Sequence, residues 1–289
     1  STTTTTTVTN KPPVAINNII NTTTNANQNV MNLLGNIKEI NQTSSYTKTN
    51  VPGLKNFLNH YYIFAPIPQT SSVKIITDVK IDSATIPINF PEDFGFSTFF
   101  SECAHCNCIN NKSLYVSGGI DYTPQPQKTN YLLKVSINPN EGAISITKLA
   151  PMNYNRCGHT MICQDKTIYV VGGEDSDTVE KYDINNNKWT VLPSMKNKRI
   201  LPILSIYNGF LYAFFGRNKN NKYSESIERL NLINLDAQWE LVLISNPNTI
   251  NLKVTQSGVI QKDEIIYFFG GKCEDKLSDK VFYFNYSSR

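Results

Sequence analysis

The chain has 289 residues, 40% of them hydrophobic, which is enough to build the core of one large all-β domain or of two ordinary domains. Its 27 basic and 23 acidic side chains leave a formal net charge of +4, too small at this length to indicate nucleic acid or another polyanion as a partner. No apolar run reaches the roughly 18 residues of a membrane-spanning helix, and the N-terminal residues lack the basic region and apolar core of a signal peptide. We therefore expect no membrane association and a cytoplasmic protein whose six cysteines are reduced.

Residues 1–55 form a low-complexity leader in which threonine and asparagine dominate. A segment with so few aromatic and charged side chains buries little apolar surface and gains little by folding, so we expect it to be disordered or draped over the rest of the chain. One exception is the stretch near residues 30–40. There Val30, Leu33 and Ile37 recur at helical spacing and predict a short helix, although Gly35 weakens that pattern.

Residues 56–289 have the pattern of one β domain. Short runs of Tyr, Phe, Val and Ile alternate with clusters of Asn, Pro, Gly and Asp, which is typical of successive strands and turns. The first predicted strands in this part of the chain are residues 61–65 and residues 72–81. The predicted fold class is therefore all-β.

An internal repeat runs through this β domain. Four segments share an apolar residue, then tyrosine, then two further positions before a turn: Leu114–Gly119, Ile168–Gly173, Leu211–Gly216 and Ile266–Gly271. The spacing of the turns is close to the roughly 40 to 50 residues of a β-propeller blade with loop insertions. Paired glycines permit a tight turn with positive φ, and the tyrosines offer large packing surfaces between adjacent blades.

Further residues align when positions are counted back from each turn. The aligned sets are Cys103 with Cys157, His105 with His159, and Glu102 with Arg156, Arg199 and Val254. Beyond the turns a third strand and a tryptophan also recur: residues 179–183 align with residues 227–231, and Trp189 aligns with Trp239. These agreements predict that the four units share one structure.

The most complete unit, residues 155–195, resembles a kelch repeat. It has an arginine before the first strand, an apolar-Tyr-Val-x-Gly-Gly second strand, a Val-Glu-x-Tyr-Asp third strand, then tryptophan and Leu-Pro-x-Met. The resemblance implies a kelch-type β-propeller with about four recognisable repeats. Because kelch rings usually have six blades, five or six blades with degenerate or missing members remain alternatives. The last unit lacks a fourth strand, so we expect residues 72–81 to pair with its exposed edge.

The Cys103-x-His105-Cys106-x-Cys108 cluster carries the ligand types of a zinc site. However, no second Cys-x-x-Cys follows it, and two of its members recur in the repeat, so we expect buried thiols and a strand histidine with no metal. The sequence contains no Gly-x-Ser-x-Gly, no phosphate-cradling loop and no paired-carboxylate motif. We therefore predict a protein that is not an enzyme and uses no cofactor.

The candidate partner-binding residues lie in the loops that, in kelch proteins, lead into the first strand and follow the second strand. Side chains in such loops are free of the demands of the fold. The candidates are Glu102, Asp121, Tyr122, Arg156, Glu174, Asp175, Arg199, Arg217 and Lys219. Because arginine makes bidentate contacts with carboxylates, Arg156 and Arg199 favour an acidic peptide as the ligand. The alternative is that these arginines tie neighbouring blades together through backbone carbonyls.

The resemblance and these loops together predict a noncatalytic scaffold that binds a protein or peptide through the propeller loops. A substrate-recognition module is the more specific form of this hypothesis. Two alternatives remain, namely a structural subunit of a large assembly and an enzyme with a site on the propeller face. The identity of the partner and the oligomeric state stay open.

Overall fold

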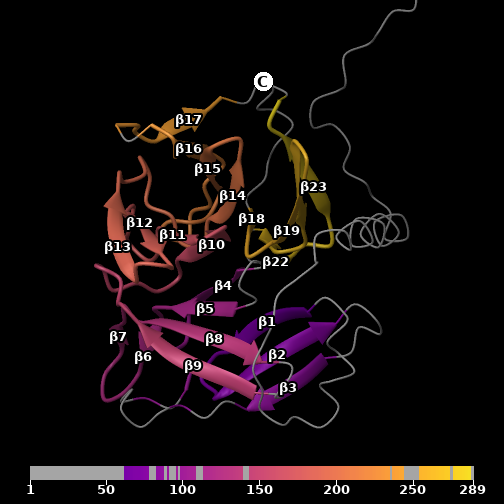
Figure 1. Ribbon diagram of the computed structural model, residues 1–289. Coiled ribbons are helices and arrows are strands. Elements are labelled where there is room, and N and C mark those ends of the chain that lie inside the picture. The colour runs from indigo at the N-terminus through magenta and orange to yellow at the C-terminus, as the bar shows by residue number, and fades with distance from the viewer. Residues whose placement is uncertain are drawn as a thin grey trace, which may run out of the picture.

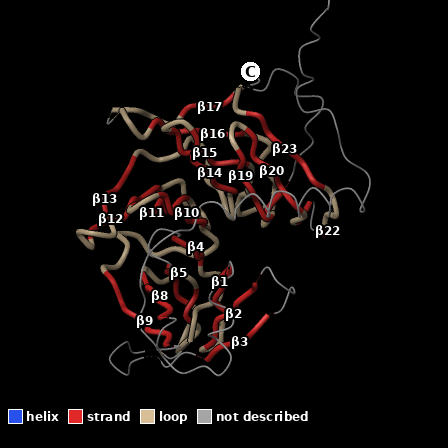
Figure 2. The backbone as a smooth tube through the Cα atoms, turned by 45° about the vertical axis from the view of Figure 1, so that its right-hand side comes forward, coloured by secondary structure: helices blue, strands red, loops and turns tan. Residues whose placement is uncertain are grey.

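The computed structural model describes residues 62–77, 83–87, 90, 96, 98–108, 113–138, 143–234, 236–243, 254–273 and 276–287 (Figure 1). Within these ranges every regular element is a β-strand, as Figure 2 shows, and the all-β prediction is confirmed. The leader at residues 1–55 and its predicted helix near residues 30–40 lie outside the described residues. The described part of the chain has no helix long and apolar enough to cross a membrane.

Each predicted repeat forms one antiparallel sheet, which we call a blade. Blade 1 consists of β4 (Ala104–Cys108), β5 (Ser113–Ser117), β8 (Leu132–Asn138) and β9 (Ala143–Leu149). Blade 2 consists of β10 (Thr160–Gln164), β11 (Thr167–Val171), β12 (Val179–Asp183) and β13 (Lys188–Leu192). Blade 3 consists of β14 (Ile203–Tyr207), β15 (Phe210–Phe214), β16 (Ile227–Asn231) and β17 (Glu240–Val242). Blade 4 consists of β19 (Gly258–Lys262), β20 (Ile265–Phe269) and β23 (Val281–Asn285).

Two smaller sheets lie in the loops of blades 1 and 4. After β5, the short strands β6 (Ile120–Asp121) and β7 (Gln127–Lys128) form a hairpin. Beside blade 4, a three-stranded sheet contains β18 (Val254–Thr255), β21 (Lys272–Cys273) and β22 (Lys276–Leu277). Both are insertions around the repeat and leave the order of strands within the blades unchanged.

The strands that precede the repeats form a sheet of their own. It contains β1 (Tyr62–Ile67), β2 (Ser72–Thr77) and β3 (Ser83–Pro87). The prediction that residues 72–81 pair with the edge of the last repeat is wrong, because β2 has β1 on one side and β3 on the other. Pairing with a strand only a few residues away costs less chain entropy than closing a loop across the domain. Figure 1 shows this sheet beside blade 1, where β1 contacts β4 and β5.

Successive blades pack face to face through their second strands. The buried clusters between blades pair Tyr115 with Ile168, Tyr169 with Leu211, and Tyr212 with Ile266. As a result, β5, β11 and β15 are buried almost throughout on both faces, whereas β20 alternates between buried and half-buried residues. Tyr267, at the same position in blade 4, is therefore only half-buried.

A tryptophan fastens the outer strand of a blade to the preceding blade. Trp189 is buried in blade 2, and its indole Nε1 donates a hydrogen bond to the carbonyl oxygen of Ala150 at 2.7 Å. Trp239 is buried just before β17, and its Nε1 donates to the carbonyl oxygen of Pro193 at 2.8 Å. Each acceptor directly follows the outer strand of the preceding blade. These indoles thus hold the fold in the way that aromatic side chains with a polar edge do when buried.

A disulfide joins the first strands of blades 1 and 2. It links Cys108 at the end of β4 to Cys163 in β10, and the two Cα atoms are 5.4 Å apart. The expectation that every cysteine is reduced is therefore wrong, and the expectation of a cytoplasmic protein loses one of its supports. Cys103, Cys106 and Cys157 carry free thiols.

The register of the first hairpin changes one part of the repeat alignment. Ala104 pairs with Ser117 just before the turn of blade 1, and Thr160 pairs with Val171 at the same point in blade 2. Four residues, 109–112, separate β4 from β5, whereas two residues separate β10 from β11. Counting back from the turn is therefore off by two residues in blade 1. The true equivalents are Phe100 with Arg156, Glu102 with Gly158, and Cys103 with His159. The predicted matches of Cys103 with Cys157, of Glu102 with Arg156 and of His105 with His159 are therefore wrong.

Candidate partner-binding face

Backbone hydrogen bonds join the loops of neighbouring blades to each other. The turn after the second strand of one blade bonds to the segment that leads into the first strand of the next. Gly119 N donates to Arg156 O at 2.7 Å, and Gly173 N donates to Arg199 O at 2.9 Å. A Cβ atom on Gly172, whose φ is +69°, would lie 2.4 Å from Arg199 O, so the first turn position of blade 2 requires glycine. The predicted loops consequently form one continuous face across blades 1, 2 and 3.

Arg156 lies inside this layer of loops, with 2% of its surface exposed. Its Nη1 donates to the carbonyl oxygens of Gly172 at 2.8 Å and Thr178 at 3.0 Å, and its Nη2 forms an ion pair of 3.0 Å with the fully buried Glu180. Burial lowers the pKa of the guanidinium group, and the hydrogen bond and charge of Glu180 oppose that shift. The backbone N of Arg156 donates to Thr129 O of blade 1 at 2.8 Å. Arg156 therefore connects blade 1 to blade 2.

Arg199 repeats this arrangement one blade later and is 0% exposed. Its Nη1 donates to the carbonyl oxygens of Phe215 at 2.6 Å and Ser226 at 2.9 Å, and its Nη2 pairs with Glu228 at 2.8 Å. Its backbone N donates to Ser176 O of blade 2 at 3.3 Å. Neither arginine presents its charge to solvent, so a partner on the loop face does not reach them. Each guanidinium group bonds to carbonyls and a carboxylate of its own blade, and only the backbone of each arginine bonds to the preceding blade.

The repeat sequences contain a pattern from which these buried ion pairs could have been predicted. Glu180 and Glu228 occupy one position of the third strand, and each occurs in a unit that also has the arginine. In the other two units both positions are apolar: Phe100 with Leu133 in blade 1, and Val254 with Phe282 in blade 4. Arginine and glutamate are thus present together or absent together. This is expected of a buried pair, because one buried charge without its partner is strongly destabilising.

Exposed ion pairs cross the loop face from blade 1 to blade 3. Lys128 of β7 lies 2.9 Å from Glu174, which follows β11. Asp175, the next residue, lies 3.1 Å from Lys198 and 3.7 Å from Lys219, both in loops of blade 3. The lysines lower the pKa of both carboxyl groups, Lys128 that of Glu174 and chiefly Lys198 that of Asp175. We call these five residues the charged rim.

The remaining candidates lie around the charged rim. Tyr122, in the hairpin between β6 and β7, is 52% exposed, and the neighbouring Asp121 is half-buried and accepts hydrogen bonds from Thr123. Arg217 is half-buried and its guanidinium group donates to the side chain of Asn221. Glu102 is exposed in the loop before β4. The structure therefore brings Glu174, Asp175 and Lys219 together. Sequence reasoning missed their lysine partners Lys128 and Lys198, because these residues fall outside the repeat pattern.

One buried serine and histidine pair lies beneath the loops. Ser117 Oγ is 2.8 Å from His159 Nε2, and both side chains are almost fully buried. Burial, with a smaller contribution from Arg156, lowers the pKa of His159 to about 3. His159 Nδ1 has no hydrogen-bond partner, so no carboxylate orients this imidazole as a general base would require. In the described ranges there is also no group of three or more His, Cys, Asp or Glu side chains that could hold a metal ion.

Comparisons with known proteins agree with this architecture. Residues 155–196 match the family model of the Kelch motif. The chain is 23% identical over 201 residues to Kelch repeat and BTB domain-containing protein 2 of Cowpox virus, covering 63% of this chain and 34% of that protein. It is 30% identical over 132 residues to human Kelch-like protein 31, covering 39% of this chain and 20% of that protein. The chain thus spans about a third or less of the length of these two relatives.

A solved structure, that of YjhT, has a similar fold. The TM-score is 0.52 at 15% sequence identity, and the superposition covers 66% of this chain and 64% of that chain. At this identity the similarity concerns the fold alone. The four blades, the interblade tyrosines and the Kelch motif matched at residues 155–196 together identify the fold as a kelch-type β-propeller.

Proposed function

We propose that the chain is a noncatalytic interaction module that binds a protein or peptide through the loop face of blades 1, 2 and 3. The charged rim carries this proposal. Its ion pairs, from Lys128 to Lys219, join three blades on the exposed surface, where such pairs contribute little to folding stability. Charges that the fold does not need can serve the electrostatic complementarity of an interface. Tyr122 adds an exposed aromatic ring of the kind enriched at interface centres.

The charge of the partner follows from which cations remain accessible. The acidic ligand expected from the sequence rested on Arg156 and Arg199, whose charges Glu180 and Glu228 balance inside the protein. The charged rim offers three lysines and two carboxylates. We therefore propose a partner segment that carries charges of both signs, arranged to exchange with the ion pairs of the rim.

The relatives support a more specific form of this proposal. The name of the Cowpox virus relative mentions kelch repeats and a BTB domain, and the human relative is named Kelch-like protein 31. We propose that in this chain the loop face recognises a substrate protein on behalf of a larger complex.

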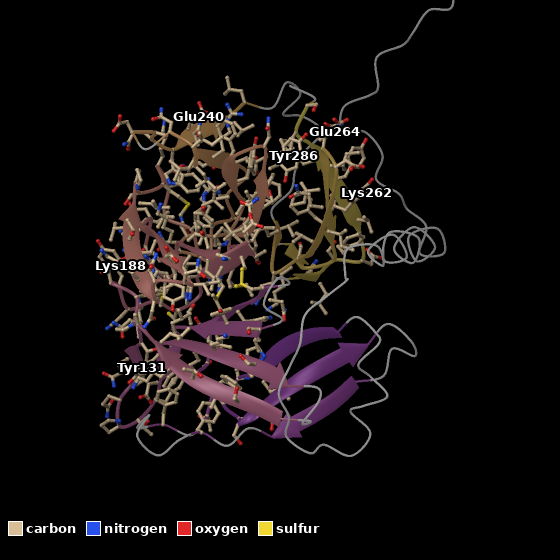
Figure 3. All side chains as sticks on the ribbon, viewed as in Figure 1. Tyr131, Lys188, Glu240, Lys262, Glu264 and Tyr286 are labelled. Carbon is tan, nitrogen blue, oxygen red and sulfur yellow. A yellow bond between two sulfur atoms is a disulfide. The ribbon has the colours of Figure 1, made fainter. Side chains whose placement is uncertain are left out.

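The test compares the proteins that co-purify with three forms of the chain. The first is the unchanged protein, the second carries Glu174→Lys with Asp175→Lys, and the third carries Lys188→Glu. Lys188 is exposed at the start of β13 (Figure 3), at the hairpin end of the strand opposite to the loop face, and so provides the control. The rim variant should lose a specific partner about tenfold, which corresponds to about 1.4 kcal/mol, while the control keeps it.

The outcome that overturns the proposal is equal recovery of every partner by all three proteins. Circular dichroism and a thermal melt of each form show that the blades are intact, so that loss of binding reports on the surface. The rim substitutions should change the melting temperature little, because the replaced carboxylates are exposed.

A further inference from the structure

The charges of the loop face are divided by sign between its two ends. In the loops of blades 1 and 2 a single lysine, Lys128, stands against five carboxylates: Glu102, Asp121, Glu174, Asp175 and Asp177. Each of these acidic residues lies before the first strand or after the second strand of its blade, and each is exposed or half-buried. We call this part of the loop face the acidic half.

The loops of blade 3, with the segment that leads into β14, have the opposite sign. Here one carboxylate, Glu225, stands against five cations: Lys196, Lys198, Arg217, Lys219 and Lys222. The four lysines are exposed and Arg217 is half-buried. Arg199 adds nothing to this surface, because Glu228 balances its charge inside the protein. We call this part of the loop face the basic half.

Ion pairs join the two halves where they meet. Asp175 of the acidic half lies 3.1 Å from Lys198 and 3.7 Å from Lys219 of the basic half. Away from this boundary, Glu102 and Asp177 form no ion pair with another described residue. The same holds for Lys196 and Lys222 on the other side. Charges of opposite sign that lie apart and unpaired are available to a ligand that spans the boundary.

We propose that the segment recognised by the loop face is bipolar, with a basic block on the acidic half and an acidic block on the basic half. This inference rests on the proposed function and adds to it the order of the charges along the partner. A segment of alternating signs would set many of its charges against like charges of each half, which costs affinity. At ordinary salt only charges within about 10 Å interact strongly, so the nearest charges decide the match.

The division by sign also favours a protein segment over a nucleic acid. A nucleic acid carries negative charge along its whole length, so the part of it beyond the basic half would face the carboxylates of the acidic half. A polypeptide can change sign along its length and match both halves.

Two synthetic peptides of identical composition test the order of charges. The first carries a block of lysines, a glycine–serine spacer and a block of glutamates, and the second carries the same residues with lysine and glutamate alternating. Titration of the whole protein at low ionic strength, followed by NMR, measures weak binding. The block peptide should bind about tenfold more tightly than the alternating peptide, and added salt should weaken both.

Charge reversal in the basic half tests where the acidic block lies. Lys196→Glu with Lys222→Glu should weaken the block peptide about tenfold and remove its advantage over the alternating peptide. The control is Lys166→Glu with Lys188→Glu, which changes the net charge equally at the end of blade 2 opposite to the loop face. All four lysines are exposed, so neither variant disturbs a core. The control should keep the preference for the block peptide.

The proposal is overturned if the block peptide does not bind, if both peptides bind equally, or if the control variant loses the preference as well. It is also overturned if light scattering shows a dimer that the block peptide dissociates, because a second copy of the chain would then occupy the two halves. Failure of the proposed function is a different result, namely equal recovery of every partner by the rim variant and its control. A face that binds partners without this order of charges would fail only the peptide test.

Discussion

The pairing of Arg156 with Glu180 and of Arg199 with Glu228 decides which residues of the loop face are accessible. A guanidinium group inside a protein must find acceptors for its donors and balance its charge. For Arg199, backbone carbonyls, serine hydroxyls and one carboxylate accept from the two Nη atoms, and the carboxylate balances the charge. The sequence alone placed these arginines correctly before the first strand. It could not show their direction, because the glutamate partners lie 24 and 29 residues further along the chain.

Removal of one arginine should therefore destabilise the protein strongly. Arg199→Met leaves the fully buried Glu228 without its ion pair, and we expect a loss of about 3–5 kcal/mol in the free energy of unfolding. The neighbouring Lys198→Met removes only an exposed ion pair and should cost about 0.5 kcal/mol or less. Urea denaturation of both variants measures the difference. Equal losses would show that Arg199 is not part of a buried pair.

At the scale of the strand and its turn, glycine patterning predicted the blades well. The turn glycines mark the ends of the second strands because their backbone has positive φ. In blades 1 and 2 the first of them, Gly118 and Gly172, also lies against the next blade. The same pattern did not reveal that the β4–β5 connection is two residues longer than the β10–β11 connection. Hairpin length leaves the period of hydrophobic residues unchanged, so only the pairing of Ala104 with Ser117 shows the shift.

The turn itself gives a test with an internal control. Gly172→Ala puts a Cβ atom within 2.4 Å of Arg199 O at a φ of +69°, and we expect destabilisation of about 2 kcal/mol or more. Gly258→Ala, in β19, meets no heavy atom closer than 3.9 Å and has no such backbone constraint. It should change the stability by less than about 1 kcal/mol. Thermal melts followed by circular dichroism measure both, and similar melting temperatures for the two variants would contradict the assigned turn geometry.

For the molecule as a whole, the sequence predicted the fold class and the four repeats but neither the sheet of β1–β3 nor the cross-link between blades. Residues 62–87 contain no turn glycine, so nothing in the repeat indicates which strand they pair with. The bridge between Cys108 and Cys163 was not predicted, because the sequence does not show how the first strands of neighbouring blades lie against each other. Long-range pairing of this kind depends on how blades stack, and a periodic pattern within one blade does not contain it.

The disulfide gives a prediction at this scale. It closes a separation of 55 residues, and replacing both cysteines with Cys108→Ala and Cys163→Ala should cost roughly 2–4 kcal/mol in the free energy of unfolding. In the unchanged protein a reductant should lower the melting temperature, whereas the double variant should melt at the same temperature with and without it. Alkylation of the denatured, unreduced protein should leave two cysteines unmodified. Modification of all six would show that the bridge does not form.

The alternation of charged and apolar pairs among the blades also bears on how a chain of similar repeats avoids joining the wrong ones. Segments with the same pattern can exchange places while a repeat protein folds, and such misassembly is a characteristic failure of these folds. If the loop carrying Arg156 entered blade 1, its charge would face Leu133 where the native residue is Phe100. A lone buried charge would penalise that exchange. Blades 2 and 3 contain the same Arg–Glu pair, so an exchange between these two blades would leave no buried charge unpaired and would not be penalised in this way.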